Sequence, residues 1–172
     1  LMVTAMATIF KKIKLETFEN IGSGPIHLPE QELHTNGIAL SFSEEKLLNL
    51  DEPTLEYTLM GLAHVLQHVA CVKVMCDKND LHAVPEIKAI HTEKPTLFLY
   101  DRYPGGIGLS ETVYEKITEI VSDAITFIEH CQCENGCPTC VGIGSVHSAT
   151  NSEKSIKMLV IHALNTVLPN GM

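Results

Sequence analysis

The sequence has few basic residues. Of its 172 residues, 12 are Lys or Arg and 21 are Asp or Glu, which gives a formal net charge of −9 at pH 7. Proteins that bind nucleic acid draw much of their affinity from clustered cations that release counterions from the phosphates. The charge balance therefore excludes autonomous, tight binding to nucleic acid, and any contact with DNA is expected to be local or shared.

The chain also lacks a long apolar run and a charged leader. No stretch approaches the roughly 20 apolar residues that a membrane-spanning helix needs. The opening residues, Leu1 to Val3, show neither the basic segment nor the small-residue cleavage site of a secretory signal. We therefore expect a soluble, cytoplasmic protein without membrane contact. Because the chain opens inside a strand-like stretch, we also expect it to be a fragment of a larger polypeptide.

Motifs for nucleotide binding and for metalloprotease chemistry are missing. The glycine-rich loop after Tyr100 satisfies neither G-x-G-x-x-G nor G-x-x-x-x-G-K-[ST], so no ATP site is expected. His64 and His68 have the spacing of a metalloprotease helix, but Val65 stands where that motif requires Glu. We interpret this histidine pair as the polar edge of a packed helix.

What is present predicts an α+β protein that forms a single domain over residues 1–172. The first quarter reads as strands, because β-branched and aromatic residues partly alternate with polar ones and turn residues follow. The predicted strands span residues 3–18, 27–29 and 32–42, with a weaker one at 87–90 and a compact central one at 96–100.

Apolar spacing of three and four residues predicts three main helices, over residues 53–75, 110–130 and 152–168, and a short one over 43–50. Pro53 suits the first turn of the longest helix. Its expected buried stripe comprises Leu55, Leu59, Leu62, Leu66 and Val69. The inner face of the next helix is expected to comprise Val113, Ile117, Ile120, Val121, Ala124 and Ile128.

A cluster of four cysteines separates the last two helices. The pattern C-x-C-x3-C-x2-C comprises Cys131, Cys133, Cys137 and Cys140. Four thiolates this close suit one tetrahedral ion about 2.3 Å from each sulfur, and zinc is the metal that such sites usually hold. Because all four positions are filled by protein, the site would be closed and structural. The sequence therefore predicts a metal-binding loop over residues 131–142.

Other uses of the cysteines are weaker. A disulfide framework suits small secreted chains, and four of the six cysteines here share one short loop. An iron–sulfur cluster is less favoured, since four ligands within ten residues suit one ion better. A thiol redox sensor remains an alternative, because neighbouring thiols could switch between metal-bound and disulfide states. Cys71 lies in an apolar helix and is expected to be a buried thiol.

Three further groups of residues are candidates for a functional or structural role. His91 and Glu93 loosely match the H-x-E part of a nucleobase deaminase signature, which leaves a metal-dependent hydrolase or deaminase as the alternative function. The loop from Asp101 predicts a tight turn in which that carboxylate accepts backbone N–H bonds. The densest basic run, Lys11, Lys12 and Lys14, is a candidate for nucleic-acid contact, although a solvated strand edge is its ordinary explanation.

Six segments together carry a family resemblance: FKKIKLET, PEQELHTNGIAL, GLAHVLQHVA, CDKNDL, LFLYDRYPGGIGLSE and CQCENGCPTCVG. In this order they resemble the C-terminal zinc-binding domain of the MrfA/YprA family of superfamily 2 DNA helicases. The resemblance spans nearly the whole chain. Its most specific parts are YDRYPGGIGLSE and the four cysteines.

The resemblance implies a domain that follows two RecA-like motor domains in an ATP-dependent 3′–5′ helicase linked to DNA repair. It implies that the four clustered cysteines bind zinc, and that the family's characteristic turn is built by Asp101, Gly105, Gly106 and Gly108. The motor's ATP-binding residues have no counterparts in this chain. We therefore expect a non-catalytic accessory domain that packs on the motor domains of the same polypeptide and helps guide single-stranded DNA.

Overall fold

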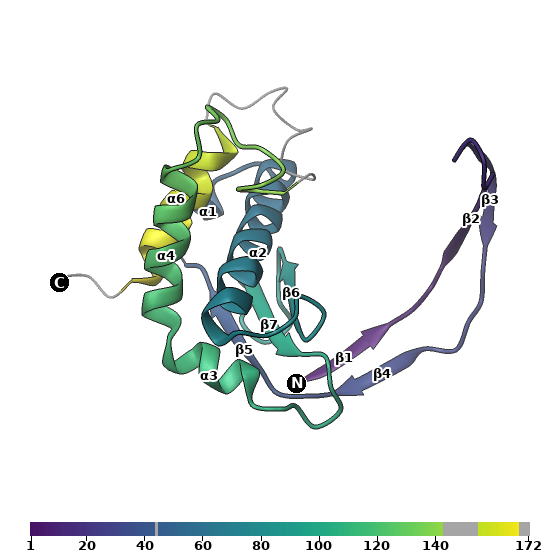
Figure 1. Cartoon of the computed structure of the whole chain (residues 1–172), viewed down its shortest axis with the longest axis horizontal. Coiled ribbons are helices and arrows are strands. Elements are labelled where there is room, and N and C mark those ends of the chain that lie inside the picture. Colours follow the sequence, from purple (N-terminus) through teal and green to yellow (C-terminus); the bar gives the residue numbers. More distant parts are fainter. Residues whose placement is uncertain (44, 143–154, 169–172) are drawn as a thin grey trace.

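A computed structural model describes residues 1–43, 45–142 and 155–168, and it separates the chain into two parts. We call residues 1–35 the arm and the described residues from 36 onward the body. Figure 1 shows the body as a group of helices packed on a small sheet, with the arm reaching away from it. The α+β class expected from the sequence is confirmed.

The arm is a long antiparallel hairpin in two sections. Near the body, β1 (Met2–Ala5) pairs with β4 (Gln31–His34); toward the tip, β2 (Ile9–Ile13) pairs with β3 (Asn20–Pro25). The single strand predicted over residues 3–18 is therefore wrong. Continuing the register of Ala5 opposite Gln31 would place Pro29 in the ladder, and a proline has no N–H to donate.

The body's sheet has the strand order β5-β7-β6, with both pairings antiparallel. β7 (Thr96–Asp101) is the central strand, as the sequence predicted, flanked by β5 (Gly37–Ser41) and β6 (Leu81–Glu86). The weak strand predicted over residues 87–90 is not formed. That segment belongs to a turn, in which Ala89 N donates to Lys94 O and Glu93 N donates to Ala89 O.

The helices are α1 (Glu45–Leu48), α2 (Glu52–Val74), α3 (Leu109–Glu115), α4 (Ile117–Glu129) and α6 (Ile156–Val167). α2 matches its predicted range. The Asp51 carboxylate caps it by accepting from Thr54 N at 3.3 Å, and Met75 ends it in the left-handed region. The helix predicted over 110–130 is broken at Lys116 into α3 and α4. Residues 152–154 of the last predicted helix lie outside the described ranges.

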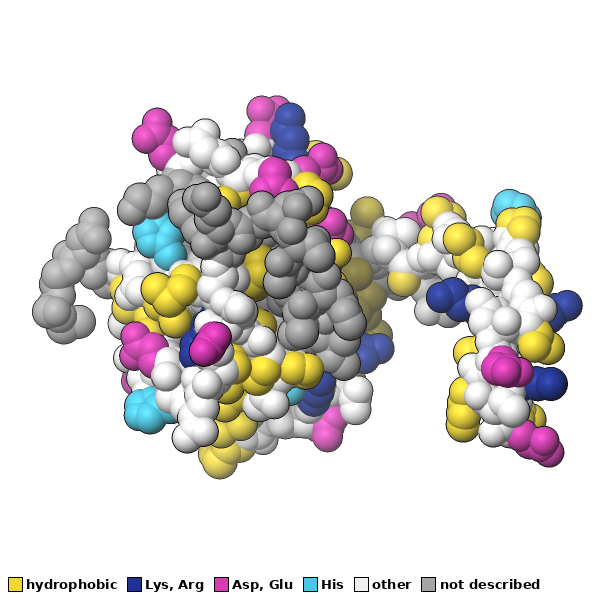
Figure 2. All heavy atoms as spheres, turned by 90° about the horizontal axis from the view of Figure 1, so that it is seen from above, with side chains coloured by type: hydrophobic (Ala, Val, Ile, Leu, Met, Phe, Trp, Pro, Cys, Tyr) yellow, Lys and Arg dark blue, Asp and Glu magenta, His cyan; other side chains and the backbone are white. Residues whose placement is uncertain are grey.

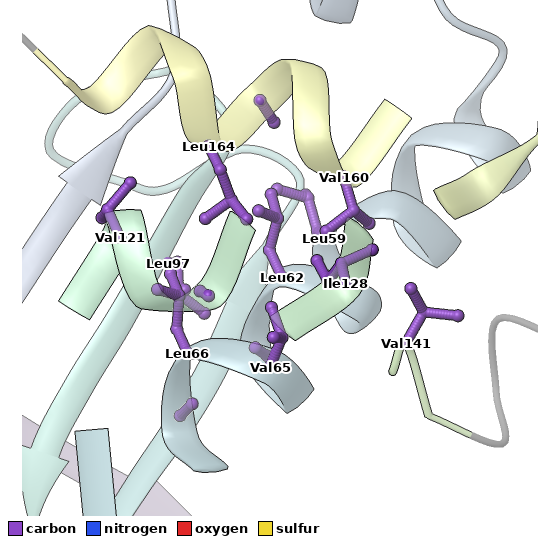
Figure 3. Close-up of a cluster of buried hydrophobic side chains, with 14 of the residues drawn as sticks. Leu59, Leu62, Val65, Leu66, Leu97, Val121, Ile128, Val141, Val160 and Leu164 are labelled. Carbon is purple, nitrogen blue, oxygen red and sulfur yellow. The ribbon is translucent and has the colours of Figure 1, made fainter. Parts of the chain in front are cut away.

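The core lies around α2, which packs between the sheet on one side and α4 and α6 on the other. Figure 3 shows α2 side chains meeting those of α4, α6 and β7. The fully buried leucines Leu62 and Leu66 are at its centre, and Val121, Val160 and Leu164 close it from the other helices. Within the described ranges, no helix is both long and apolar enough to cross a membrane.

Candidate metal centre

The four clustered sulfurs converge on one point. Cys131 Sγ lies 3.5 Å from Cys137 Sγ, and Cys133 Sγ lies 3.4 Å from Cys140 Sγ. Cys137 Sγ and Cys140 Sγ are 3.6 Å apart, and all four sulfurs lie within 4.8 Å of one another. A tetrahedral ion with metal–sulfur bonds of about 2.3 Å requires sulfur–sulfur edges of about 3.8 Å. The loop therefore already has the dimensions of a site for a single ion.

The distances between the sulfurs are too long for disulfide bonds. A disulfide needs an S–S distance of about 2.05 Å, and none of the six cysteines, all of which lie in the described ranges, is in a disulfide. The sulfurs also form the one group of three or more metal-ligating side chains found among the described residues. Four thiolates with no open position fit zinc in a structural role.

The loop is shaped by backbone features between its two cysteine pairs. Gly136 has a φ of +119°, and a Cβ there would lie 2.6 Å from Val141 Cγ2, so only glycine fits. Cys137 N donates to Cys140 Sγ at 3.3 Å, and Val141 N donates to Cys137 O at 3.0 Å. These bonds hold Cys137 and Cys140 in a tight knuckle, so that both sulfurs point toward the first cysteine pair.

The thiols of the cluster differ in acidity. Burial raises the pKa of Cys140 to about 12, and burial also raises the pKa of Cys133. Hydrogen bonding from the backbone of Cys140 lowers the pKa of Cys137 to about 6, although burial opposes this. A metal that takes the Cys140 thiolate at neutral pH must therefore displace its proton, so metal binding is coupled to proton release.

Helix α2 supports the second half of the loop. His64 Nε2 lies 3.1 Å from Thr139 O, inside the Cys137–Cys140 knuckle, and a Cβ on Gly142 would lie 3.1 Å from the His64 ring. Burial lowers the pKa of His64, which favours the neutral ring. The His68 ring is tilted by 41° from the His64 ring at a centroid distance of 4.3 Å, and His68 Nδ1 lies 2.9 Å from His64 O. His64 thus holds the loop against the core, a contact that the sequence did not predict.

Helix α6 supports the first half of the loop. Lys157 Nζ donates to Cys131 O at 2.6 Å and to Cys133 O at 2.9 Å, while Lys157 N donates to Asn135 O at 3.2 Å. Lys157 is buried, which is uncommon for lysine. The sequence held a signal for this residue, because Lys157 precedes Val160 and Leu164 at helical spacing and so falls on the apolar face.

The predicted turn after β7 lies where the arm joins the body. The buried Asp101 carboxylate accepts from Ile107 N at 2.7 Å, Leu109 N at 3.2 Å and Ser110 N at 2.7 Å. The turn glycines Gly105, Gly106 and Gly108 all have positive φ. At Gly106 a Cβ would also lie 2.9 Å from Asn36 Cβ, so side-chain bulk there would push on the segment between β4 and β5.

The remaining candidate residues lie apart from the metal centre. His91 and Glu93 are exposed in the turn between β6 and β7, and neither belongs to the four-sulfur group. Lys11, Lys12 and Lys14 are exposed on the arm, where Figure 2 shows basic and apolar side chains together. Lys12 Nζ lies 5.8 Å from the centroid of the Phe10 ring.

Comparison with known families and proteins places this centre in a recognised domain. Residues 62–141 match the family described as MZB, the MrfA Zn-binding domain. The ATP-dependent helicase YprA of Bacillus subtilis (strain 168) is 55% identical over 140 residues, which cover 81% of this chain and 19% of YprA. The protein MJ1572.1 of Methanocaldococcus jannaschii is 35% identical over 49 residues, or 28% of this chain and 44% of that protein.

Two solved structures extend the match over nearly the whole chain. A crystal structure of the DUF1998 helicase MrfA bound to DNA has a TM-score of 0.75 and 48% identity, covering 96% of this chain and 22% of MrfA. A second, of MrfA bound to DNA and AMPPNP, has a TM-score of 0.68 and 47% identity, covering 95% of this chain and 20% of that one. The chain thus spans about a fifth of the length of these helicases. These relatives do not favour the hydrolase, deaminase or redox-sensor alternatives.

Proposed function

We propose, from the premise that this chain carries the zinc-binding domain of the MrfA/YprA helicase family, that it is a non-catalytic accessory domain of an ATP-dependent 3′–5′ DNA helicase acting in DNA repair. The observation that carries the proposal is the closed set of four sulfurs within the region that matches the family. A closed site leaves no position for substrate or water. Its work is to fix the shape of a surface.

The proposed zinc ligands are Cys131, Cys133, Cys137 and Cys140. When bound, zinc would hold the end of α4 to the loop residues that contact α2 and α6. Protein purified without added metal should be colourless and contain about one zinc per chain. Iron together with inorganic sulfide would contradict this ligand assignment.

The proposed partner is the set of motor domains in the same polypeptide. The two MrfA structures compared above are bound to DNA, and this chain covers about a fifth of each. We expect removal of the segment from the longer polypeptide to reduce strand separation far more than ATP hydrolysis, because the motor residues remain. Unchanged unwinding of a 3′-tailed duplex would contradict an accessory role. ATP hydrolysis by this chain alone would contradict its non-catalytic assignment.

The proposed contact with single-stranded DNA is the arm. Its lysines Lys11, Lys12 and Lys14 are exposed beside apolar and aromatic side chains, a combination that suits a backbone-and-base contact. Because the chain is acidic as a whole, this contact would add to one made elsewhere in the polypeptide.

Cytoplasmic localisation belongs to the same proposal, since a DNA helicase acts where the DNA is.

The arm contact can be tested by replacing the three arm lysines with Gln in the full polypeptide. Three lost phosphate contacts should lower the salt slope of single-stranded DNA binding by about 2, at about 0.7 per contact. The matched control replaces three exposed body lysines, Lys78, Lys88 and Lys94, with Gln, which changes the net charge equally. Equal slopes in the two triple variants would overturn the arm assignment.

A further inference from the structure

Lys157 is a buried lysine with no counter-ion among the described residues. It lies in the first turn of α6, and only 9% of its surface is exposed. Among the described residues, no carboxylate forms a salt bridge with its ammonium group. Burying an unpaired charge is costly, so such a lysine needs compensation from its surroundings.

Lys157 contacts the metal loop. Its Nζ donates two short hydrogen bonds, to Cys131 O at 2.6 Å and to Cys133 O at 2.9 Å. Both acceptors belong to proposed ligand residues, so the lysine fixes the backbone of the first cysteine pair. Two neutral carbonyls accept from two of the three ammonium N–H donors but do not balance the charge. Four thiolates around one divalent ion carry excess negative charge and would supply that balance.

The start of α6 reinforces the same contact. Lys157 N donates to Asn135 O at 3.2 Å, and Ser155 Oγ donates to Glu134 O at 3.4 Å. The positive end of the helix dipole therefore also faces the loop that carries the sulfurs. Partners that orient ligand residues from outside the first coordination sphere commonly tune metal affinity.

We propose that Lys157 is a positioning residue of the zinc centre, which orients the Cys131–Cys133 pair through its two carbonyls and stabilises the zinc–thiolate cluster through its charge. The proposal rests on the zinc ligands proposed above. It differs from a purely structural role in one respect. A lysine that only ties α6 to the loop would stabilise the zinc-free and zinc-bound proteins equally, whereas a charge-balancing lysine stabilises the zinc-bound protein more.

The test compares Lys157→Met, Lys157→Gln and Lys157→Arg in the zinc-loaded protein by competition with a chromophoric chelator. Met removes charge and donor, Gln keeps a donor without charge, and Arg keeps both. We expect zinc affinity to fall by about 10–100-fold for Met and Gln, and Arg to retain most of the affinity. The control is Lys88→Met, which removes an exposed lysine with the same change in net charge.

If Lys157→Met or Lys157→Gln folds poorly, thermal unfolding is measured at several zinc concentrations. A variant that recovers its fold as zinc is raised, and whose folded form still binds zinc at least 10-fold more weakly than wild type, supports the proposal. A variant that stays unfolded at saturating zinc, or neutral variants with wild-type affinity, would overturn it. If the wild-type protein itself holds no zinc, the ligand assignment fails first, so the two failures are distinguishable.

Discussion

The body and the arm are built from similar proportions of apolar residues but use them differently. In the body, Leu62 and Leu66 are completely buried, whereas in the arm Leu15 is 90% exposed and Phe18 is 78% exposed. The body also has its metal loop, which contacts two helices. A two-stranded ribbon such as the arm is marginally stable by itself in water. Buried apolar packing and exposed apolar surface therefore belong to different parts of the chain.

The junction between the two parts is well bonded. Thr35 Oγ1 donates to Asp101 O at 2.7 Å, and Gly105 N donates to His34 O at 2.8 Å. The arm is thus fixed at its base while its tip contacts nothing in the body (Figure 1). Apolar surface this exposed commonly marks an interaction site, which agrees with a chain that spans about a fifth of its helicase relatives.

Loss of the metal should produce the largest difference in stability between the body and the arm. Zinc sites can supply roughly 10–16 kcal/mol of apparent binding free energy to folding, so Cys140→Ser should destabilise the body by several kcal/mol. Amide hydrogen exchange should rise in α4, α6 and the loop and stay unchanged in the arm. Cys76→Ser is the matched control, since Cys76 lies outside the cluster. Equal protection of α4 and α6 in both variants would contradict a structural metal.

Truncation of one leucine in each part should show the next largest difference. Leu62→Ala removes a fully buried side chain from the centre of α2 and should cost about 2–5 kcal/mol. Leu15→Ala removes a side chain that is 90% exposed and should change stability by no more than about 0.5 kcal/mol. Urea unfolding of both variants measures this. A similar cost at both positions would mean that the arm tip packs against something.

The sequence predicted features that depend on neighbouring residues. The stripe of α2, the central strand and the cysteine spacing are local signals, and α2 and β7 formed where they were expected. The zinc assignment and the family resemblance were also confirmed by the comparisons. In each case the physical cause, such as helical periodicity or tetrahedral ligand spacing, acts over a few residues.

Features that depend on distant residues were not predictable in this way. The alternation of apolar and polar residues in the arm is the same for a strand that packs on a core and for one that does not. The sequence therefore contains no local signal that the arm projects from the body. The break at Lys116 interrupts an apolar spacing that continues across it. Helical spacing places Lys157 on an apolar face, but no local pattern indicates the loop that it contacts, 24 to 26 residues earlier.

Substitution of Asp101 in the turn after β7 should have an intermediate effect on stability. Asp101→Asn replaces one acceptor oxygen with an NH2 group that faces backbone donors, which should cost about 1–3 kcal/mol in the free energy of unfolding. The control is Asp123→Asn, which loses an exposed ion pair with Lys73 and should cost no more than about 1 kcal/mol. Equal unfolding free energies for the two variants would show that the Asp101 carboxylate does not stabilise the turn after β7.

A pH dependence at alkaline pH is expected from the buried thiol of Cys71 in the body. Burial raises the pKa of Cys71 from 9.0 to about 12, so the folded state holds this proton more strongly than the unfolded state. Its contribution to stability is therefore complete below pH 9 and is lost as pH rises from 9 toward 12. Cys71→Ala removes this dependence, so the stability difference between wild type and variant should shrink across that range. A difference that stays constant with pH would show that Cys71 ionises as easily in the fold as in the unfolded chain.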